Sequence, residues 1–216
     1  MVRRTKQEAE VTRSHILDTA ELLFEEHGVS RTSLNDIAQA AGVTRGAIYW
    51  HFRDKADLFN AMMERATLPL EEAVHASDDP RQQDPVQHMR RCFTDALRKT
   101  VDDPQVRRVF EIATHKVEYV GELEAVRDRH LRVRNECLAH VAQGLRLAKR
   151  RGQLNGRIPA RVAAIGLHAL VDGLIQNWML DPTAFDLVKA GQQVMDTFLA
   201  GLMPADAATV AARPPR

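Results

Sequence analysis

The chain has 216 residues, of which 44% are apolar and 27% charged, and its formal net charge is +1 at pH 7. This composition is ordinary for a globular protein with a sizeable core, and the near-zero balance neither favours nor excludes a nucleic-acid partner. The sequence has no run of about 18 apolar residues, and its charged start MVRRTKQEAE lacks the apolar segment of a secretory signal, so a cytoplasmic protein without a membrane span is expected.

A first helix is predicted over residues 12–27, because apolar side chains recur there at helical spacing. The stripe consists of Ile16, Ala20, Leu23, Phe24 and His27. Gly28 follows directly and is a natural residue for the end of a helix.

Two short helices come next. Ser33 is a good N-cap for the first of them, and Asp36 in its first turn favours the helix N-terminus. Ala41 and Gly42 close this helix. Thr44 then caps the second short helix, which is predicted to run to about residue 50.

Asp54 caps a longer helix over 55–75. The polar segment ASDDPRQQDP, with two prolines, is interpreted as the main boundary of the chain. Beyond it, helical spacing and stop signals predict further helices over about 86–101, 104–119, 121–151, 159–180 and 184–203. No strand pattern stands out. The expected fold class is therefore all-α, with a three-helix N-terminal unit joined by a fourth helix to a larger helical domain.

The stretch AAGVT joins the two short helices in the layout of a helix-turn-helix, with Gly42 where a left-handed backbone is needed. The second helix of such a motif enters the major groove of DNA by its N-terminal end. Thr44, Arg45 and Gly46 lie at that end. Arg45 is the best candidate to read guanine edges or to hold a phosphate, and Gly46 lets the backbone approach the duplex.

Ring side chains follow in a row, although aromatic residues make up only 5% of the chain. Phe52, four residues after Ile48, is expected to fill the small core. Tyr49, His51 and Lys55 can donate hydrogen bonds to phosphate oxygens, and for the two rings DNA contact is favoured over core packing. For Trp50 both interpretations stay open.

The segment TSLNDIAQAAGVTRGAIYWHFRDKADLF resembles the DNA-binding signature of the TetR family of bacterial repressors, closest to the branch of multidrug-efflux regulators around AcrR and TtgR. The segments RRTKQEAEVTRSHILDTAELLF, HKVEY, RRGQL and VDGLI are similar to that branch too. The resemblance implies a homodimer on a palindromic operator in double-stranded DNA. Carried over by position, the DNA-binding residues are Thr32, Ser33, Thr44, Arg45, Gly46, Tyr49, Trp50, His51 and Lys55.

With this resemblance the expected domains are a helix-turn-helix DNA-binding domain (1–54), a connecting helix (55–75), a ligand-binding and dimerisation domain (76–203) and a disordered Ala/Pro-rich tail (204–216). Residues 1–60 hold eight Lys or Arg against nine Asp or Glu. Binding to DNA must therefore depend on the placement of charges and on helix N-termini. Arg3, Arg4 and Lys6 form either a basic arm or a merely solubilising start.

The branch places an apolar pocket for drug-like or plant-phenolic molecules in its C-terminal helices, and a permissive site needs apolar walls with a few polar groups. The resemblance gives as candidates Phe93, Leu97, Phe110, Thr114, His115, Val117, His168, Val171, Asp172, Ile175 and Gln176. For Phe93, Leu97 and Val171, core packing explains the pattern equally well. Asp172 lies between apolar residues and is costly to bury unpaired. It is expected either to anchor a ligand or to bond to a neighbouring helix.

The family expectation for the dimer is an interface formed by the last two helices. Its predicted apolar residues are Ile165, Leu170, Trp178, Leu187, Val194 and Phe198. The inducer implied by the resemblance is a small apolar or aromatic molecule, and no cofactor is expected. Rival interpretations are a TetR-like regulator that senses no small molecule, and an activator in place of a repressor.

An enzyme is not expected, because the sequence has no HExxH, no GxSxG, no Gly-rich phosphate loop and no close set of metal ligands. His115 and Glu118 share a helix face, but a lone pair is weak evidence for a site. Cys92 and Cys137 stand far apart without CxxC spacing, which indicates reduced thiols. Buried, unreactive thiols are favoured over a redox pair.

Overall fold

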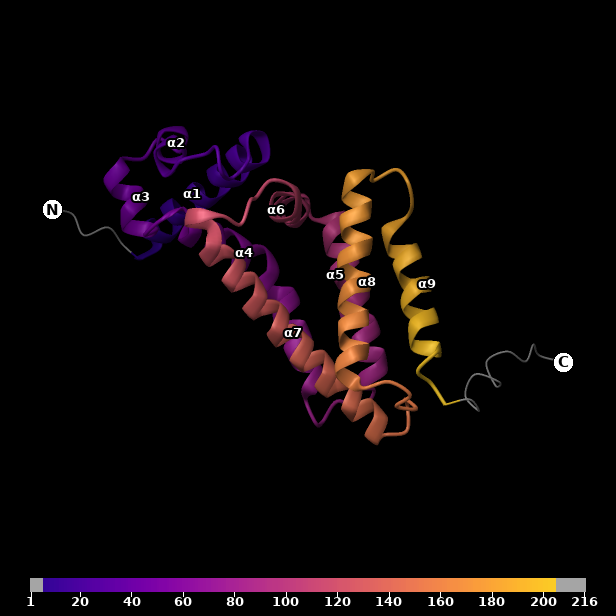
Figure 1. Ribbon diagram of the computed structural model, residues 1–216. Coiled ribbons are helices and arrows are strands. Elements are labelled where there is room, and N and C mark those ends of the chain that lie inside the picture. The colour runs from indigo at the N-terminus through magenta and orange to yellow at the C-terminus, as the bar shows by residue number, and fades with distance from the viewer. Residues whose placement is uncertain (1–5, 205–216) are drawn as a thin grey trace. The chain divides into compact units, whose positions relative to one another are not determined.

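The structure, a computed structural model, describes residues 6–204, which form nine α-helices and two short 3-10 helices and contain no strand (Figure 1). The all-α prediction is confirmed. Arg3, Arg4 and the predicted tail from residue 205 onward lie outside the described residues. The chain divides into two compact units: residues up to Thr67 with Pro104–Arg132 form the first, and Leu68–Asp103 with the chain from Val133 onward forms the second.

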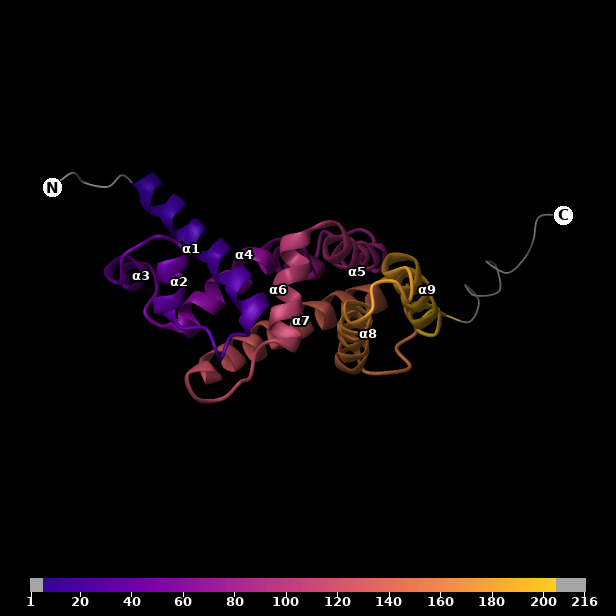
Figure 2. The same ribbon diagram turned by 90° about the horizontal axis from the view of Figure 1, so that it is seen from above.

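The first unit contains three N-terminal helices, most of α4, all of α6 and the start of α7. Their bounds are α1 Lys6–His27, α2 Leu34–Ala40, α3 Arg45–His51, α4 Lys55–His75, α6 Pro104–His115 and α7 Glu124–Arg150. Helix α6 packs on α1, as seen from above in Figure 2. One apolar core joins these helices: Phe24 and Phe59 contact each other inside it, and Val109 and Ile112 of α6 are fully buried in the same cluster.

The second unit is built on α5, α8 and α9, with the ends of α4 and α7. Its elements are the 3-10 helix η1 Ala76–Asp78, α5 Pro85–Asp102, α8 Ala160–Leu180 and α9 Leu187–Ala200. Helices α8 and α9 lie side by side (Figures 1 and 2). Close packing depends on Gly191 of α9, where an added Cβ would stand 2.1 Å from a methyl carbon of Leu97 on α5. A larger residue at this position would require the Leu97 side chain, or α9 against α5, to shift.

The units differ from the division expected at residues 54 and 75. Helix α4 changes unit after Thr67, and α6 groups with the N-terminal helices. Pro69 lies two residues beyond this change and has no N–H to donate to the carbonyl four residues earlier. The hydrogen-bond ladder of α4 is therefore interrupted close to where the helix passes from one unit to the other. The functional division by residue range stays a prediction.

Candidate nucleic-acid interface

Helix α2 begins as the sequence predicts. Ser33 has an extended backbone and forms a reciprocal capping box with Asp36: the Ser33 hydroxyl accepts from the Asp36 amide at 3.2 Å, and the Ser33 amide donates to the Asp36 carboxylate at 2.9 Å. Hydrogen bonds from the hydroxyl and then the amide of Ser33 hold the pKa of Asp36 below its ordinary value. The turn after α2 closes at Gly42, whose φ of +64° favours glycine.

Helix α3 is capped by Thr44, whose hydroxyl accepts from the Ala47 amide at 3.1 Å. Ile48 and Phe52 are buried in the core of the first unit, which confirms the prediction for both. The position of Gly46 is open, since an added Cβ would find only the Thr44 hydroxyl, at 4.0 Å. The N-terminal end of α3 is therefore accessible, and a large partner can approach its backbone.

The face of α3 opposite the buried Ile48 carries the exposed ring side chains. Tyr49 is 47% exposed and Trp50 73% exposed. The Arg45 guanidinium lies 5.7 Å from the centre of the Tyr49 ring, and the His51 ring packs edge-on against Trp50 at 4.6 Å. Trp50 is thus not a core residue, and its contact with DNA stays a prediction. Flat rings beside a guanidinium suit sugar and phosphate groups.

Charge around α3 is positive, although the wider unit is balanced. Residues 37–53 contain no Asp or Glu but include Arg45 and Arg53.

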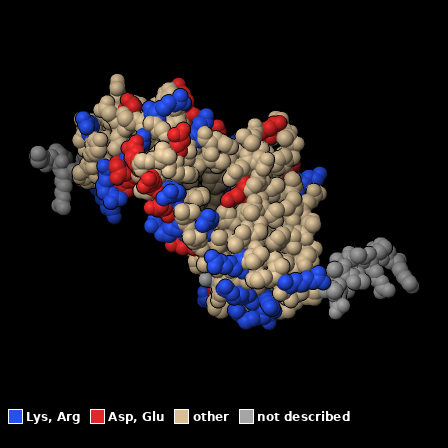
Figure 3. All heavy atoms as spheres, in the orientation of Figure 1, with Lys and Arg blue, Asp and Glu red and all other residues tan. Residues whose placement is uncertain are grey.

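Figure 3 shows the scattered acidic and basic side chains of one face of the molecule, and in the second unit it shows a gathering of basic ones. Between residues 146 and 161 the exposed cations are Arg146, Lys149, Arg150, Arg151, Arg157 and Arg161.

Two predicted DNA-binding residues point inward. Thr32 is buried, and its hydroxyl donates to the carbonyl of Gly28 at 2.9 Å. The side chain of Lys55 is only 6% exposed. Its ammonium donates to the carbonyl of Val29 at 3.0 Å and forms an ion pair with Glu122 at 2.7 Å. In this structure the ammonium is occupied by protein oxygens, which corrects the expectation that it stands ready to donate to a phosphate.

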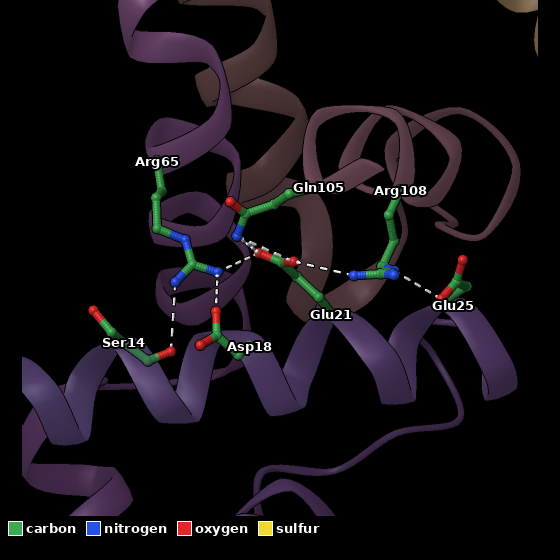
Figure 4. Close-up of polar contacts among 7 residues, drawn as sticks. All are labelled: Ser14, Asp18, Glu21, Glu25, Arg65, Gln105 and Arg108. Carbon is green, nitrogen blue, oxygen red and sulfur yellow. Dashed lines mark hydrogen bonds and ion pairs between the residues drawn. The ribbon is translucent and has the colours of Figure 1, made fainter. Parts of the chain in front are cut away.

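A buried carboxylate that sequence reasoning missed links three helices of the first unit (Figure 4). Glu21 of α1 is 2% exposed and forms an ion pair with Arg65 of α4. Its carboxylate also accepts from the Gln105 side chain of α6 at 3.0 Å and lies 3.9 Å from the guanidinium of Arg108. Arg108 pairs in turn with Glu25 at 2.8 Å. Charged groups on α4 and α6 therefore meet on one face of α1.

The predicted ligand-binding residues fall in both units. Phe110 and Val117 pack on the core of the first unit, and Thr114 and His115 are exposed there. In the second unit, Phe93, Leu97 and Ile175 are buried. The remaining four are half-buried (His168 and Val171) or exposed (Asp172 and Gln176).

Asp172 pairs within its own helix, and its role as a ligand anchor stays a prediction. Its side chain is 50% exposed and pairs with His168 one turn earlier on α8, at 3.0 Å. It is therefore neither buried nor bonded to a neighbouring helix. The hydrogen bond to Asp172 raises the pKa of His168 above its ordinary value, against the opposing effect of burial.

Two predicted dimer residues, Trp178 and Leu187, are buried in the second unit and offer no surface to a partner. Ile165 of α8, also predicted, is about half exposed, and so is Val162, which was not predicted. Leu170, Val194 and Phe198 are half-buried. The exposed large apolar residues of α8 are thus Val162 and Ile165 near its start and Leu180 at its end.

Neither cysteine has the environment of a reactive thiol. Burial is the main cause that raises the pKa of Cys137 to about 11, and it also raises the pKa of Cys92. The thiolate that nucleophilic or redox chemistry needs is disfavoured at both. Among residues 6–204, no three His, Cys, Asp or Glu side chains are placed to hold a metal ion. No helix in the same range has the length and apolar content to cross a bilayer.

A capped pair of short helices, an accessible N-terminal end on the second and no Asp or Glu in residues 37–53 define a helix-turn-helix transcription regulator. Residues 16–62 match the model of the bacterial regulatory proteins of the tetR family. Residues 84–204 match the C-terminal region of MAATS-type transcriptional repressors. The chain belongs to the TetR family, whose members are DNA-binding regulators and not enzymes.

Individual relatives agree over nearly the whole chain. The HTH-type transcriptional regulator TtgR of Pseudomonas putida is 40% identical over 199 residues, 92% of this chain and 95% of that protein. The solved structure of NalD, the secondary repressor of the MexAB-OprM multidrug efflux pump in Pseudomonas aeruginosa, is 34% identical with a TM-score of 0.84, covering 93% of this chain and 100% of that one. SmeT, the repressor of the Stenotrophomonas maltophilia multidrug efflux pump SmeDEF, solved with triclosan, is 31% identical with a TM-score of 0.83, covering 95% and 100%.

Proposed function

We propose that the chain represses a multidrug efflux operon and leaves its operator when an apolar or aromatic small molecule binds. The observation that carries this proposal is the likeness, over more than nine-tenths of the chain, to NalD and SmeT, both described as repressors of multidrug efflux pumps. SmeT has been solved with triclosan, a small aromatic compound. A protein of this function acts in the cytoplasm, where its DNA is.

For DNA binding, we propose that the N-terminal end of α3 enters the major groove. Thr44, Arg45 and Gly46 lie at its accessible N-terminus, and Arg45 is the proposed base or phosphate contact. Tyr49, Trp50 and His51 are proposed to pack on the sugar-phosphate backbone. Ser33, the exposed N-cap of α2, is proposed as a further contact, and buried Thr32 is proposed to act by holding the loop before it.

A palindromic operator requires two copies of the chain, with recognition helices about one DNA turn (~34 Å) or somewhat more apart. The proposed dimer face lies on α8. Val162 and Ile165 are about half exposed there, and exposed Ala169 follows one turn later at the same face. A half-exposed valine and isoleucine with a small residue beside them allow close helix packing.

On the ligand side, we propose that the second unit supplies the specific contacts. Its MAATS-type region spans α5, α8 and α9. His168, Val171 and Gln176 of α8 are only partly buried or exposed, and they combine an apolar wall with groups that can donate or accept. An inducer works only through a higher affinity for the form that does not fit DNA.

The test uses the full chain and fluorescein-labelled duplexes from the DNA preceding its own gene and neighbouring transporter genes. Fluorescence anisotropy should detect tight binding to at least one duplex, and triclosan should release it at a concentration that leaves the Arg45→Ala variant's residual non-specific binding unchanged. Binding without release by triclosan or other pump-exported aromatics would favour a regulator that senses no such ligand. A rise in transcription on binding would indicate an activator. Failure to bind any duplex would overturn the proposal.

A further inference from the structure

We propose that the connector between α6 and α7, residues 116–123, positions the DNA-facing loop 28–33, and that Glu122 is a positioning residue for operator binding. The connector is the pink segment between these two helices in Figure 2. The inference rests on the proposed function and adds to it a regulatory contact. All the groups involved belong to the first unit.

The first contact is the ammonium of Lys55. It is the first residue of α4, where the positive end of the helix dipole disfavours a cation. Its side chain is nevertheless buried, so the charge needs several partners. Those partners are the carbonyl oxygens of Val29 at 3.0 Å and Ser30 at 3.4 Å, and the Glu122 carboxylate at 2.7 Å. Glu122 is thus the only one of these three that carries a compensating charge.

The second contact is between main chains. The Val29 amide donates to the carbonyl of Lys116 at 3.0 Å, and the Val29 side chain is fully buried. The connector itself is held from its other side, because Leu123 is buried in the core and the Tyr119 hydroxyl donates to the Ala113 carbonyl at 3.1 Å. A connector fixed in this way can hold the loop in place at two points.

The loop leads straight into the proposed DNA-binding residues. Ser30 stands two residues before Thr32, whose hydroxyl closes the loop onto Gly28 at 2.9 Å. Ser33 then caps α2. If the loop loses its contact with Lys55, Ser33 and the first turn of α2 can shift. Phosphate contacts tolerate little displacement, so binding to DNA should weaken. Because the connector continues α6, a change in α6 can reach the operator contacts by this route.

A simpler role for both residues makes the opposite prediction. If Lys55 swings out to bind a phosphate and Glu122 is merely a surface acid, removing the negative charge of Glu122 should strengthen binding to DNA or leave it unchanged. Positioning predicts weaker binding from the same change. The sign of the effect therefore separates the two roles without any need to mutate the buried lysine.

The experiment compares Glu122→Gln with Glu118→Gln in the full chain. Glu118 is exposed on the same connector, and its side chain forms no ion pair or hydrogen bond within residues 6–204, so the control removes the same charge without the contact. The DNA is a duplex selected by the wild-type protein from a random-sequence pool. Affinity is measured by anisotropy at several salt concentrations, together with the melting temperature of each variant.

We expect Glu122→Gln to bind the selected duplex about tenfold more weakly than Glu118→Gln, with the same slope of affinity against salt because no phosphate contact is lost. A Lys55→Met variant should show the same unchanged slope. Equal or tighter binding by Glu122→Gln, or a flatter slope for Lys55→Met, would overturn the inference while leaving the proposed function intact. A wild-type protein that selects no duplex would overturn both.

Discussion

Replacing Glu21 by Gln tests whether the buried carboxylate beneath α4 and α6 stabilises the first unit. Glutamine keeps the shape and one acceptor oxygen, but it loses the negative charge beside Arg65 and Arg108. Its amide nitrogen, in the place of Oε2, would stand 3.9 Å from the Arg108 guanidinium, and Gln105 would have to turn its own amide over to offer an acceptor. Breaking a buried ion pair costs about 3–5 kcal/mol when the remaining charge has no other partner. Arg65 retains Asp18 at 2.8 Å and the Ser14 carbonyl at 3.4 Å. The expected loss of unfolding free energy is therefore smaller, about 2 kcal/mol.

For a chain of this length, about 2 kcal/mol corresponds to a fall in melting temperature of roughly 4–8 °C. The matched control is Glu25→Gln, which removes a carboxylate that is 40% exposed and, among residues 6–204, pairs with Arg108 alone. Its effect should stay below about 1 kcal/mol. Both variants are measured by thermal and urea unfolding at one fixed protein concentration and neutral pH. Equal losses for the two variants would refute the argument that burial makes the Glu21 contacts strong.

Three further outcomes are expected. Arg45→Ala should keep the fold and lower operator affinity by about 1–3 kcal/mol per half-site, and an unchanged affinity at fixed salt would remove Arg45 from the interface. Ile165→Asp should make the protein monomeric at micromolar concentration in sedimentation, and a stable dimer would place the interface elsewhere. Asp172→Asn should lower stability by less than about 1 kcal/mol at about pH 5.5 and hardly at all at about pH 8.5. The reason is that the pKa of His168 is raised in the folded protein, so its pairing with Asp172 stabilises the fold fully below the unfolded pKa, about 6.5. This stabilisation is lost as the pH rises through the folded pKa. The same loss of stability at both pH values would contradict this.

The local features of the DNA-binding end could be predicted from the sequence, because each depends on residues close together in the chain. Ser33 and Thr44 cap their helices as expected, and Gly42 has the predicted left-handed backbone. Ile48 and Phe52 are buried, as their spacing of four indicates. Caps and turns need only short-range chemistry, and a single sequence carries that information.

The features that failed depend on partners far away in the chain. Lys55 is predicted as a phosphate ligand, but in the structure it forms an ion pair with Glu122. Trp178 and Leu187 were expected on a dimer face, but helical spacing alone cannot tell a buried stripe from one covered by a second protomer. The burial of Glu21 is not predicted from the sequence, because an isolated Glu within a helix is usually solvated. For Trp50 the sequence left core packing and DNA contact open, because spacing alone does not separate them, and the structure excludes the core.

The near-neutral charge of the DNA-binding end is explained by where its acids are used. Asp36 caps α2, and its carboxylate faces the Ser33 amide and hydroxyl. Asp54 caps α4 by accepting from the Asp57 amide at 2.7 Å, and Asp57 accepts from the Arg53 amide at 3.0 Å. Each acid that flanks α3 is thus directed at helix N-termini or at a neighbouring cation, where a negative charge stabilises the fold.

Further acids of the first unit are paired with its cations. Glu21 and Glu25 bind the cations of α4 and α6, and Glu122 compensates Lys55. The surface around α3 is left with Arg45 and exposed rings and with no carboxylate in residues 37–53. A domain with more acids than bases in its first 60 residues can therefore still present a locally positive face to DNA, because a bound phosphate responds to charges within about one Debye length, roughly 8–10 Å, and not to the formal total.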